Sequence, residues 1–293
     1  DVRAKVCTDE DIANARATLN VSVGFDNENI YIPTLGRTPR SGKANLYVMQ
    51  LNGRSSFCLN GAKSATTGLS YKIHHKIDPS NKNWYKTYQF ALQHLSTTSE
   101  NEKLAYFTAQ SAFWILANNQ LVTKTNLTQI VEEMYLTKNC ATLINNFKKG
   151  TNINLDANSF CNSNFNSTAG ITTIKNMINN ILKQQTNNSY QMEYDAIIKN
   201  IASLADQYMS FTSVYTGTLY YWESGDHQPM IAPLDCDDST NPSQKEYYCT
   251  DKNGVKHDYT EEYKTCLSQG TESSVCKSQL DNKYCGSSQK KYR

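Results

Sequence analysis

Nine cysteines constrain what this chain can fold into more than any other feature of its sequence. None forms a Cys-x-x-Cys pair, so the spacing argues against a zinc ribbon and against a thioredoxin-type redox site. Five cysteines lie between residues 236 and 285 among Asp, Ser, Lys and Gly, a pattern typical of a small disulfide-stapled module in a secreted protein. Because nine is odd, at least one cysteine lacks an intramolecular disulfide partner. We therefore expect an oxidising compartment and one thiol with a separate role.

Composition and charge remove several classes of partner. The 293 residues are 39% hydrophobic and 19% charged, which is typical of a folded chain long enough to bury a core. The longest apolar run, residues 112–117, is far shorter than the ~20 residues of a membrane-spanning helix. A formal net charge of +2 gives no basic footprint. We therefore expect no insertion into a membrane and no nucleic-acid partner.

Four Asn-x-Ser/Thr sequons are compatible with a secreted glycoprotein. The chain is so rich in Asn, Ser and Thr that chance alone accounts for four of them, so the sequons permit glycosylation without indicating it. The candidate glycosylation residues are Asn20, Asn126, Asn166 and Asn187.

The first eighty residues have a β pattern. Alternating apolar and polar residues predict strands at residues 19–25, 29–32, 45–50, 55–59 and 68–73. The clearest hairpin joins the third and fourth of these strands through Asn52-Gly53, a dipeptide that favours the tight turn between paired strands. The β pattern returns at residues 211–222 and 230–232.

The pattern between these two β regions is helical. Ser99 and Glu102 have the spacing of a capping box that begins a helix, and apolar periodicity predicts further helices at residues 129–147, 174–182 and 197–208. We expect a loop in the Asn- and Ser-rich stretch after residue 147. Cys140 and Cys161 flank this stretch, and a disulfide between them would clamp it.

Strands, then helices, then strands indicate an α+β fold in which a β-sandwich or barrel-like frame carries a helical insertion. We expect the frame to comprise residues 1–87 and 209–232, and the insertion residues 88–208. A C-terminal disulfide-rich module would follow at residues 233–293.

Gln110 and Cys58 are the two candidates for chemistry. On a helix, Gln110 shares its face with aromatic residues three and four positions away, so its amide is expected to be removed from water. The more common structural interpretation is a glutamine that hydrogen-bonds a backbone group. Cys58, between Phe57 and Leu59 on a predicted strand, likewise has a structural interpretation as a core residue or half of a disulfide.

Taken together, the two segments resemble the internal-thioester domains of bacterial surface adhesins. The matching residues are Phe57-Cys58-Leu59-Asn60 at the end of a hairpin and Gln110-Ser111-Ala112-Phe113-Trp114 on a helix. In that family the cysteine sulfur is joined to the glutamine side-chain carbonyl with loss of ammonia. The resemblance covers roughly residues 15–232 and implies a β part tied to a helical part by this crosslink.

The resemblance implies roles for particular residues. Cys58 and Gln110 would form the thioester, and an amine on a partner would attack the Gln110 carbonyl in a single turnover, without cofactor or metal. The residues expected to shield the bond from water are Tyr106, Phe107, Phe113 and Trp114. A thioester at Cys58 also leaves enough cysteines for four disulfides, and these candidates are Cys7, Cys140, Cys161, Cys236, Cys249, Cys266, Cys276 and Cys285.

Three histidines are candidates for acid–base chemistry. His74 and His75 follow a predicted strand, and His94 precedes the capped helix, so each is a candidate to deprotonate an incoming amine. A loop histidine is more often simply solvated. With Cys58, one of these histidines would alternatively form a secreted Cys-His hydrolase, although the local signatures of papain-type and caspase-type proteases are absent.

The sequence therefore predicts a secreted or surface-displayed adhesion domain that couples covalently to a protein or another amine-bearing surface ligand. The alternative is a structural glycoprotein that assembles with copies of itself into an extracellular fibre or coat. In that case the thioester and the disulfides would act only as staples.

Overall fold

A closed six-stranded barrel forms the centre of the computed structural model, which describes residues 7–24, 47–61, 63, 65–236 and 247–286. The strand order around the barrel is β1-β2-β3-β6-β5-β4, and every pairing is antiparallel. The β frame is therefore a barrel, and its strands come from both ends of the predicted frame. The strands are β1 (Arg16–Gly24), β2 (Tyr47–Leu51), β3 (Arg54–Cys58), β4 (Ser70–Lys76), β5 (Leu219–Glu223) and β6 (Met230–Pro233).

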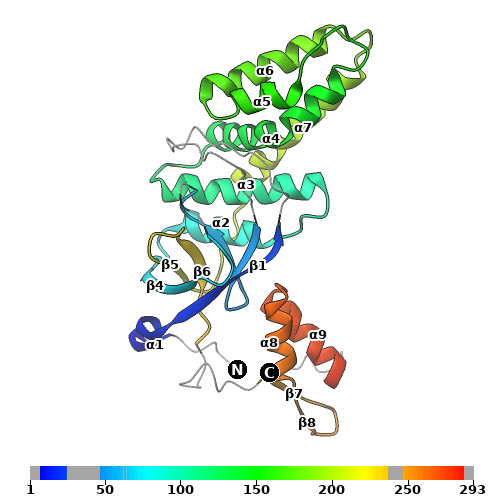
Figure 1. Cartoon of the computed structure of the whole chain (residues 1–293). Coiled ribbons are helices and arrows are strands. Elements are labelled where there is room, and N and C mark those ends of the chain that lie inside the picture. The colour runs from blue at the N-terminus through cyan, green and yellow to red at the C-terminus, as the bar shows by residue number, and fades with distance from the viewer. Residues whose placement is uncertain (1–6, 25–46, 62, 64, 237–246, 287–293) are drawn as a thin grey trace.

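The chain between β4 and β5 is helical and stacks above one side of the barrel (Figure 1). In Figure 1, α2 and α3 lie next to the strands, α4 covers α3, α5 and α6 lie farthest from the barrel, and α7 runs from them back towards α3. None of the helices in the described part of the chain is both long and apolar enough to cross a membrane. The six are α2 (Lys82–Leu92), α3 (Glu100–Ala117), α4 (Lys124–Phe147), α5 (Ala157–Asn164), α6 (Thr168–Lys183) and α7 (Ser189–Ser210).

Helix α3 is the central element of the stack. Its predicted start is confirmed, because the Ser99 side chain accepts from the backbone N–H of Glu102 and the Glu102 carboxylate accepts from the N–H of Ser99. Every residue from Leu104 to Leu116 is buried. A helix buried on all faces needs cover on all sides. The barrel and α2 provide that cover on one side, and α4 and α7 provide it on the other.

Two predicted segments have different structures because tertiary contacts override their local pattern. The predicted strand at residues 211–222 begins only at Leu219. Before it, the chain lies on α2, where Tyr85 accepts from the N–H of Tyr215 through its carbonyl and from the N–H of Leu219 through its hydroxyl. The predicted loop after residue 147 contains helix α5, which Asp156 caps by accepting from the N–H of Ser159.

Two helices also begin earlier than predicted. Helix α2 begins at Lys82, so helical structure starts before residue 88, and α4 begins at Lys124 rather than at residue 129. The N-terminal extension of α4 has its own capping box, in which Asn126 takes the position that Glu or Gln usually occupies. The strand predicted at residues 29–32 lies outside the described residues.

The C-terminal module has a small core of its own. Strands β7 (Tyr248–Thr250) and β8 (Lys256–Asp258) pair, and helices α8 (Thr260–Ser268) and α9 (Ser273–Cys285) pack beside them below the barrel in Figure 1. A short helix, α1 (Asp9–Asn14), precedes β1 at the other end of the described chain. The hydrophobic core of the module is formed by Tyr259, Tyr263, Cys276 and Leu280.

This module docks on the hairpin that ends in Cys58. The turn between β2 and β3 has positive φ at Asn52 (50°) and Gly53 (76°), which confirms the predicted tight turn. The carbonyl of Gly53 accepts from the N–H of Ser273 at 2.8 Å, and the Asn20 amide donates to the carbonyl of Leu267 at 3.3 Å. A Cβ atom at Gly53 would lie 2.6 Å from the Leu267 side chain.

Gly53 therefore has two structural roles: it adopts positive φ in the turn, and it leaves room for the Leu267 side chain. Comparison with Gly68 separates the two. We expect Gly53→Ala and Gly68→Ala each to lose about 1–2 kcal/mol of unfolding free energy, because both glycines have positive φ. Only Gly53→Ala also displaces the Leu267 side chain, since Gly68 has open space around it. Hydrogen exchange in α8 and α9 is expected to rise in Gly53→Ala alone. Equal exchange in the two variants would contradict this docking contact.

Candidate functional site

Eight of the nine cysteines form disulfides, and the ninth is Cys58. All nine lie in the described part of the chain, and Cys58 is the one among them that forms no disulfide. The predicted clamp between Cys140 and Cys161 is confirmed, with 5.9 Å between the two Cα atoms. The other pairs are Cys7–Cys236, Cys249–Cys285 and Cys266–Cys276.

Cys58 is the last residue of β3 and is buried. Its backbone pairs with Met230 of β6, and its sulfur lies 3.9 Å from the Met49 sulfur on β2. Only 4% of the residue is exposed. The thiol is therefore enclosed between neighbouring strands and the helix that covers this side of the barrel.

The Gln110 side chain makes both of its hydrogen bonds with the backbone of Cys58. Its Oε1 accepts from the Cys58 N–H at 2.9 Å, and its Nε2 donates to the Cys58 carbonyl at 2.7 Å. Gln110 is completely buried, so these bonds satisfy an amide that would otherwise destabilise the fold by about 1–3 kcal/mol. The two residues selected from the sequence, 52 positions apart, are thus in direct contact.

Aromatic side chains surround this contact. Phe57 stacks on Phe113 with 5.1 Å between ring centroids, and its ring lies 6.3 Å from that of Tyr106. Trp114 is also buried, whereas the buried ring of Phe107 faces α4, where the Lys138 Nζ lies 5.9 Å from it. The four residues expected to shield the bond are therefore all inside the protein, in more than one direction from Cys58.

Two tyrosine hydroxyls are electrostatically coupled to Cys58. Burial raises the pKa values of Tyr71 and Tyr106, and a negative charge on Cys58 raises both further. Both phenols are therefore neutral over the physiological pH range. The Tyr71 hydroxyl donates to the carbonyl of Gln228 at 2.7 Å, which fixes its position beside the site.

Gln228 is a functional-site neighbour that the sequence pattern did not indicate. Its Oε1 accepts from the N–H of Asn60 at 3.2 Å and from the indole N–H of Trp114 at 3.4 Å, and its Nε2 donates to the carbonyl of Lys63 at 3.0 Å. It therefore joins the segment after Cys58 to the helix that carries Gln110. A glutamine in a loop before a strand gives no local signal of this role.

The three candidate histidines lie in two places. His74 and His75 are adjacent on β4, where their Nδ1 atoms are 2.6 Å apart and the His75 ring stacks on Tyr221. Burial, assisted by His74, lowers the pKa of His75, so this ring is neutral at neutral pH. His94 follows α2 and packs on Phe90, and burial lowers its pKa too.

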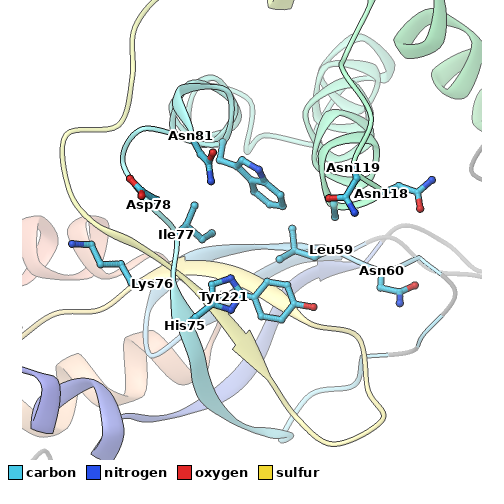
Figure 2. Close-up of a pocket in the computed structure, with 12 residues that line it drawn as sticks. Leu59, Asn60, His75, Lys76, Ile77, Asp78, Asn81, Asn118, Asn119 and Tyr221 are labelled. Carbon is cyan, nitrogen blue, oxygen red and sulfur yellow. The ribbon is translucent and has the colours of Figure 1, made fainter.

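A cleft of about 560 Å³ opens beside the end of β3 (Figure 2). Leu59 and Asn60, the two residues that follow Cys58, line it together with Trp84 of α2 and Tyr221 of β5. His75 lies under Tyr221 in this view. The cleft therefore adjoins the Cys58–Gln110 contact on the side of the barrel that α2 and the end of α3 cover.

The glycosylation candidates differ in accessibility. Asn166 and Asn187 are exposed at the turns before α6 and α7. Asn20 and Asn126 are half-buried, and their side-chain nitrogens donate to the carbonyls of Leu267 and Leu121. Only the first two sequons have the exposure that an attached glycan needs.

Comparison with known proteins gives no relative for this site. Neither a protein-family model, nor a curated protein, nor a solved structure matches the chain. Within the described residues, no group of three or more His, Cys, Asp or Glu side chains has the arrangement to hold a metal ion. The chemistry of the site therefore has to be argued from its own residues.

Gln228 provides a test of the polar network around the site. We expect Gln228→Leu to lower the unfolding free energy by about 1–3 kcal/mol, because the buried N–H groups of Asn60 and Trp114 then lose a partner. His227→Ala, at the exposed neighbouring position, is the control and should leave stability unchanged. Chemical denaturation measures both. If the two variants unfold alike, the network does not contribute to stability.

Proposed function

We propose that Cys58 and Gln110 form an internal thioester and that this protein is an extracellular adhesion domain which acylates an amine on its partner. One observation supports this most: the one cysteine without a disulfide is buried and holds a completely buried glutamine amide against its own backbone. A cysteine and a glutamine that served only in packing would have no reason to contact each other. The resemblance to thioester domains selects the same two residues independently.

Formation of the bond needs only groups at this contact. The Cys58 sulfur attacks Cδ of Gln110, the C–N bond breaks, and the thiol proton leaves with the amide nitrogen as ammonia. The Cys58 N–H already donates to Oε1 at 2.9 Å, so it can stabilise the negative charge that this oxygen gains during the attack. The hydrogen bond from Nε2 is lost with the leaving group, while the one to Oε1 is retained.

The product is an acyl group that an amine can accept. A neutral amine attacks the Gln110 carbonyl carbon, the C–S bond breaks, and an amide forms while Cys58 regains its thiol. The step consumes the thioester, so each molecule reacts once. Burial protects the bond from hydrolysis until a partner docks. Four disulfides are compatible with an extracellular location, where amine-bearing surface ligands are available.

Intact mass tests the bond directly. With disulfides reduced by a phosphine, which does not exchange with thioesters, the wild-type protein should weigh one ammonia less than its sequence. Cys58→Ala and Gln110→Ala should each have the full mass expected for their sequences. Gln50→Ala, which removes another buried glutamine, should retain the deficit. A wild-type protein without the deficit would rule out the thioester.

The second candidate function is a structural subunit in which the same bond is only a staple. The complete burial of Gln110 favours this alternative, because an external amine needs a rearrangement to reach the carbonyl. A crosslink between residues 58 and 110 would stabilise the fold by roughly 3–5 kcal/mol if the loop-entropy relation for disulfides applies. Copies of the chain would then assemble into a fibre or coat without covalent reaction.

Methylamine separates these functions. If the protein is an adhesin, methylamine at neutral pH should add to Gln110 in the folded state and release one titratable thiol. If the bond is a staple, addition should occur only after denaturation. A Cys-His hydrolase would instead turn over an ester substrate repeatedly, lose that activity in Cys58→Ala, and have no mass deficit.

A further inference from the structure

The cleft beside Cys58 contains three asparagine amides that are not used by the fold. Asn81, Asn118 and Asn119 line it, and none of these side chains has a hydrogen-bond partner within the described part of the protein. In Figure 2, Asn81 lies on one side of the cleft and the other two lie on the opposite side. Each amide offers two N–H donors and a carbonyl acceptor.

Two of these asparagines are unusual for their backbone positions. Asn81 is the N-cap residue of α2, where asparagine usually accepts a hydrogen bond from the first turn, yet it makes no capping bond. Asn119 follows the C-cap of α3 with φ of 57°, a conformation in which glycine is the common residue. At both sites an asparagine presents its amide to the cleft.

Two aromatic rings add apolar surface. Trp84 and Tyr221 are both half-buried, so each keeps part of its ring accessible. Their positions are fixed from behind, because Trp84 packs on Phe113 at 6.2 Å and Tyr221 stacks on His75 at 4.9 Å. Rigid aromatic surface loses little conformational entropy when it binds a ligand.

The charges around the cleft favour a neutral ligand. Asp78 and Lys76 carry opposite charges and lie at the same end, and the Asp78 carboxylate accepts from the N–H of Ser80. The Lys76 side chain extends away from the aromatic rings in Figure 2. Burial and the neighbouring His74 lower the pKa of His75, which is therefore uncharged at neutral pH. Neither an anion nor a cation finds a cluster of opposite charge here.

We propose that this cleft is a binding site for a neutral saccharide. Saccharide hydroxyls both donate and accept hydrogen bonds, which matches the three amides. The apolar C–H face of a sugar ring can lie on Trp84 or Tyr221 and so be removed from water. The volume of about 560 Å³ lies within the range of small-molecule sites.

The position of the site gives this binding a consequence for the acylation. Leu59 and Asn60 line the cleft and directly follow Cys58, so a glycan held there lies beside the thioester. An amine on the same glycoconjugate then has a high effective concentration at the Gln110 carbonyl. This consequence rests on the proposed function, whereas saccharide binding itself does not require the thioester.

Tryptophan fluorescence of the full chain carrying Cys58→Ala tests the proposal, so the result does not depend on the thioester. Trp114 and Trp222 are 3% and 1% exposed, which makes Trp84 the accessible reporter. The probes are cellotriose, maltotriose, mannotriose, triacetylchitotriose and lactose, all of them uncharged. We expect at least one to change the emission saturably, and Trp84→Phe to abolish this change.

The double variant Asn81→Ala with Asn119→Gly removes two amides without disturbing the backbone, because Asn81 makes no capping bond and glycine accepts positive φ. It should weaken binding at least about tenfold. Asn179→Ala with Asn180→Ala, on the exposed face of α6, is the matched control and should bind normally. The proposal is overturned if none of the five saccharides binds, if the double variant binds equally well, or if a heparin hexasaccharide or a lysine-rich peptide binds instead.

Discussion

The pairing of the Gln110 amide with the backbone of Cys58 sets the relation between the two main parts of the molecule. Helix α3 is buried on every face, and its one side-chain amide that reaches a strand does so at the end of β3. Two hydrogen bonds to one residue define a single register of the helix on the strand, in addition to the fit of its apolar side chains. The barrel and α3 are joined through this contact and, beside it, through Gln228, which accepts from Asn60 and from Trp114 of α3.

Burial of the Cys58–Gln110 contact has opposite effects on the lifetime of a thioester there and on the access of an amine to its carbonyl. Excluding water extends the lifetime of a thioester, but it also keeps a soluble amine away from the carbonyl. The cleft lies at the boundary between these two requirements, since Leu59 belongs both to the buried core and to the cleft wall. Under the proposed function, docking at the cleft would be the step at which the buried acyl group and an external nucleophile meet.

Local signals explain what the sequence predicted well. The capping box at Ser99 and the turn at Asn52-Gly53 depend on neighbours within a few residues, and both are present. Contacts between distant segments leave no such signal within a few residues. No local pattern indicates that Tyr85 holds the chain before β5, that Gln228 joins the segment after Cys58 to α3, or that Asn119 keeps an amide where glycine is usual. The Cys58–Gln110 contact is predictable only from two short motifs taken together, because neither motif alone indicates it.

The disulfide between Cys7 and Cys236 has a mechanical consequence if the chain is pulled from its two ends. It joins positions 229 residues apart, and the whole barrel, the helical stack and the Cys58–Gln110 contact lie between them. Tension applied to the chain outside these two cysteines passes through the sulfur–sulfur bond and bypasses everything enclosed. The Cys58–Gln110 contact is thereby isolated from longitudinal load, and the Cys249–Cys285 disulfide protects the C-terminal module in the same way, so the load falls on the segment between these two closed loops.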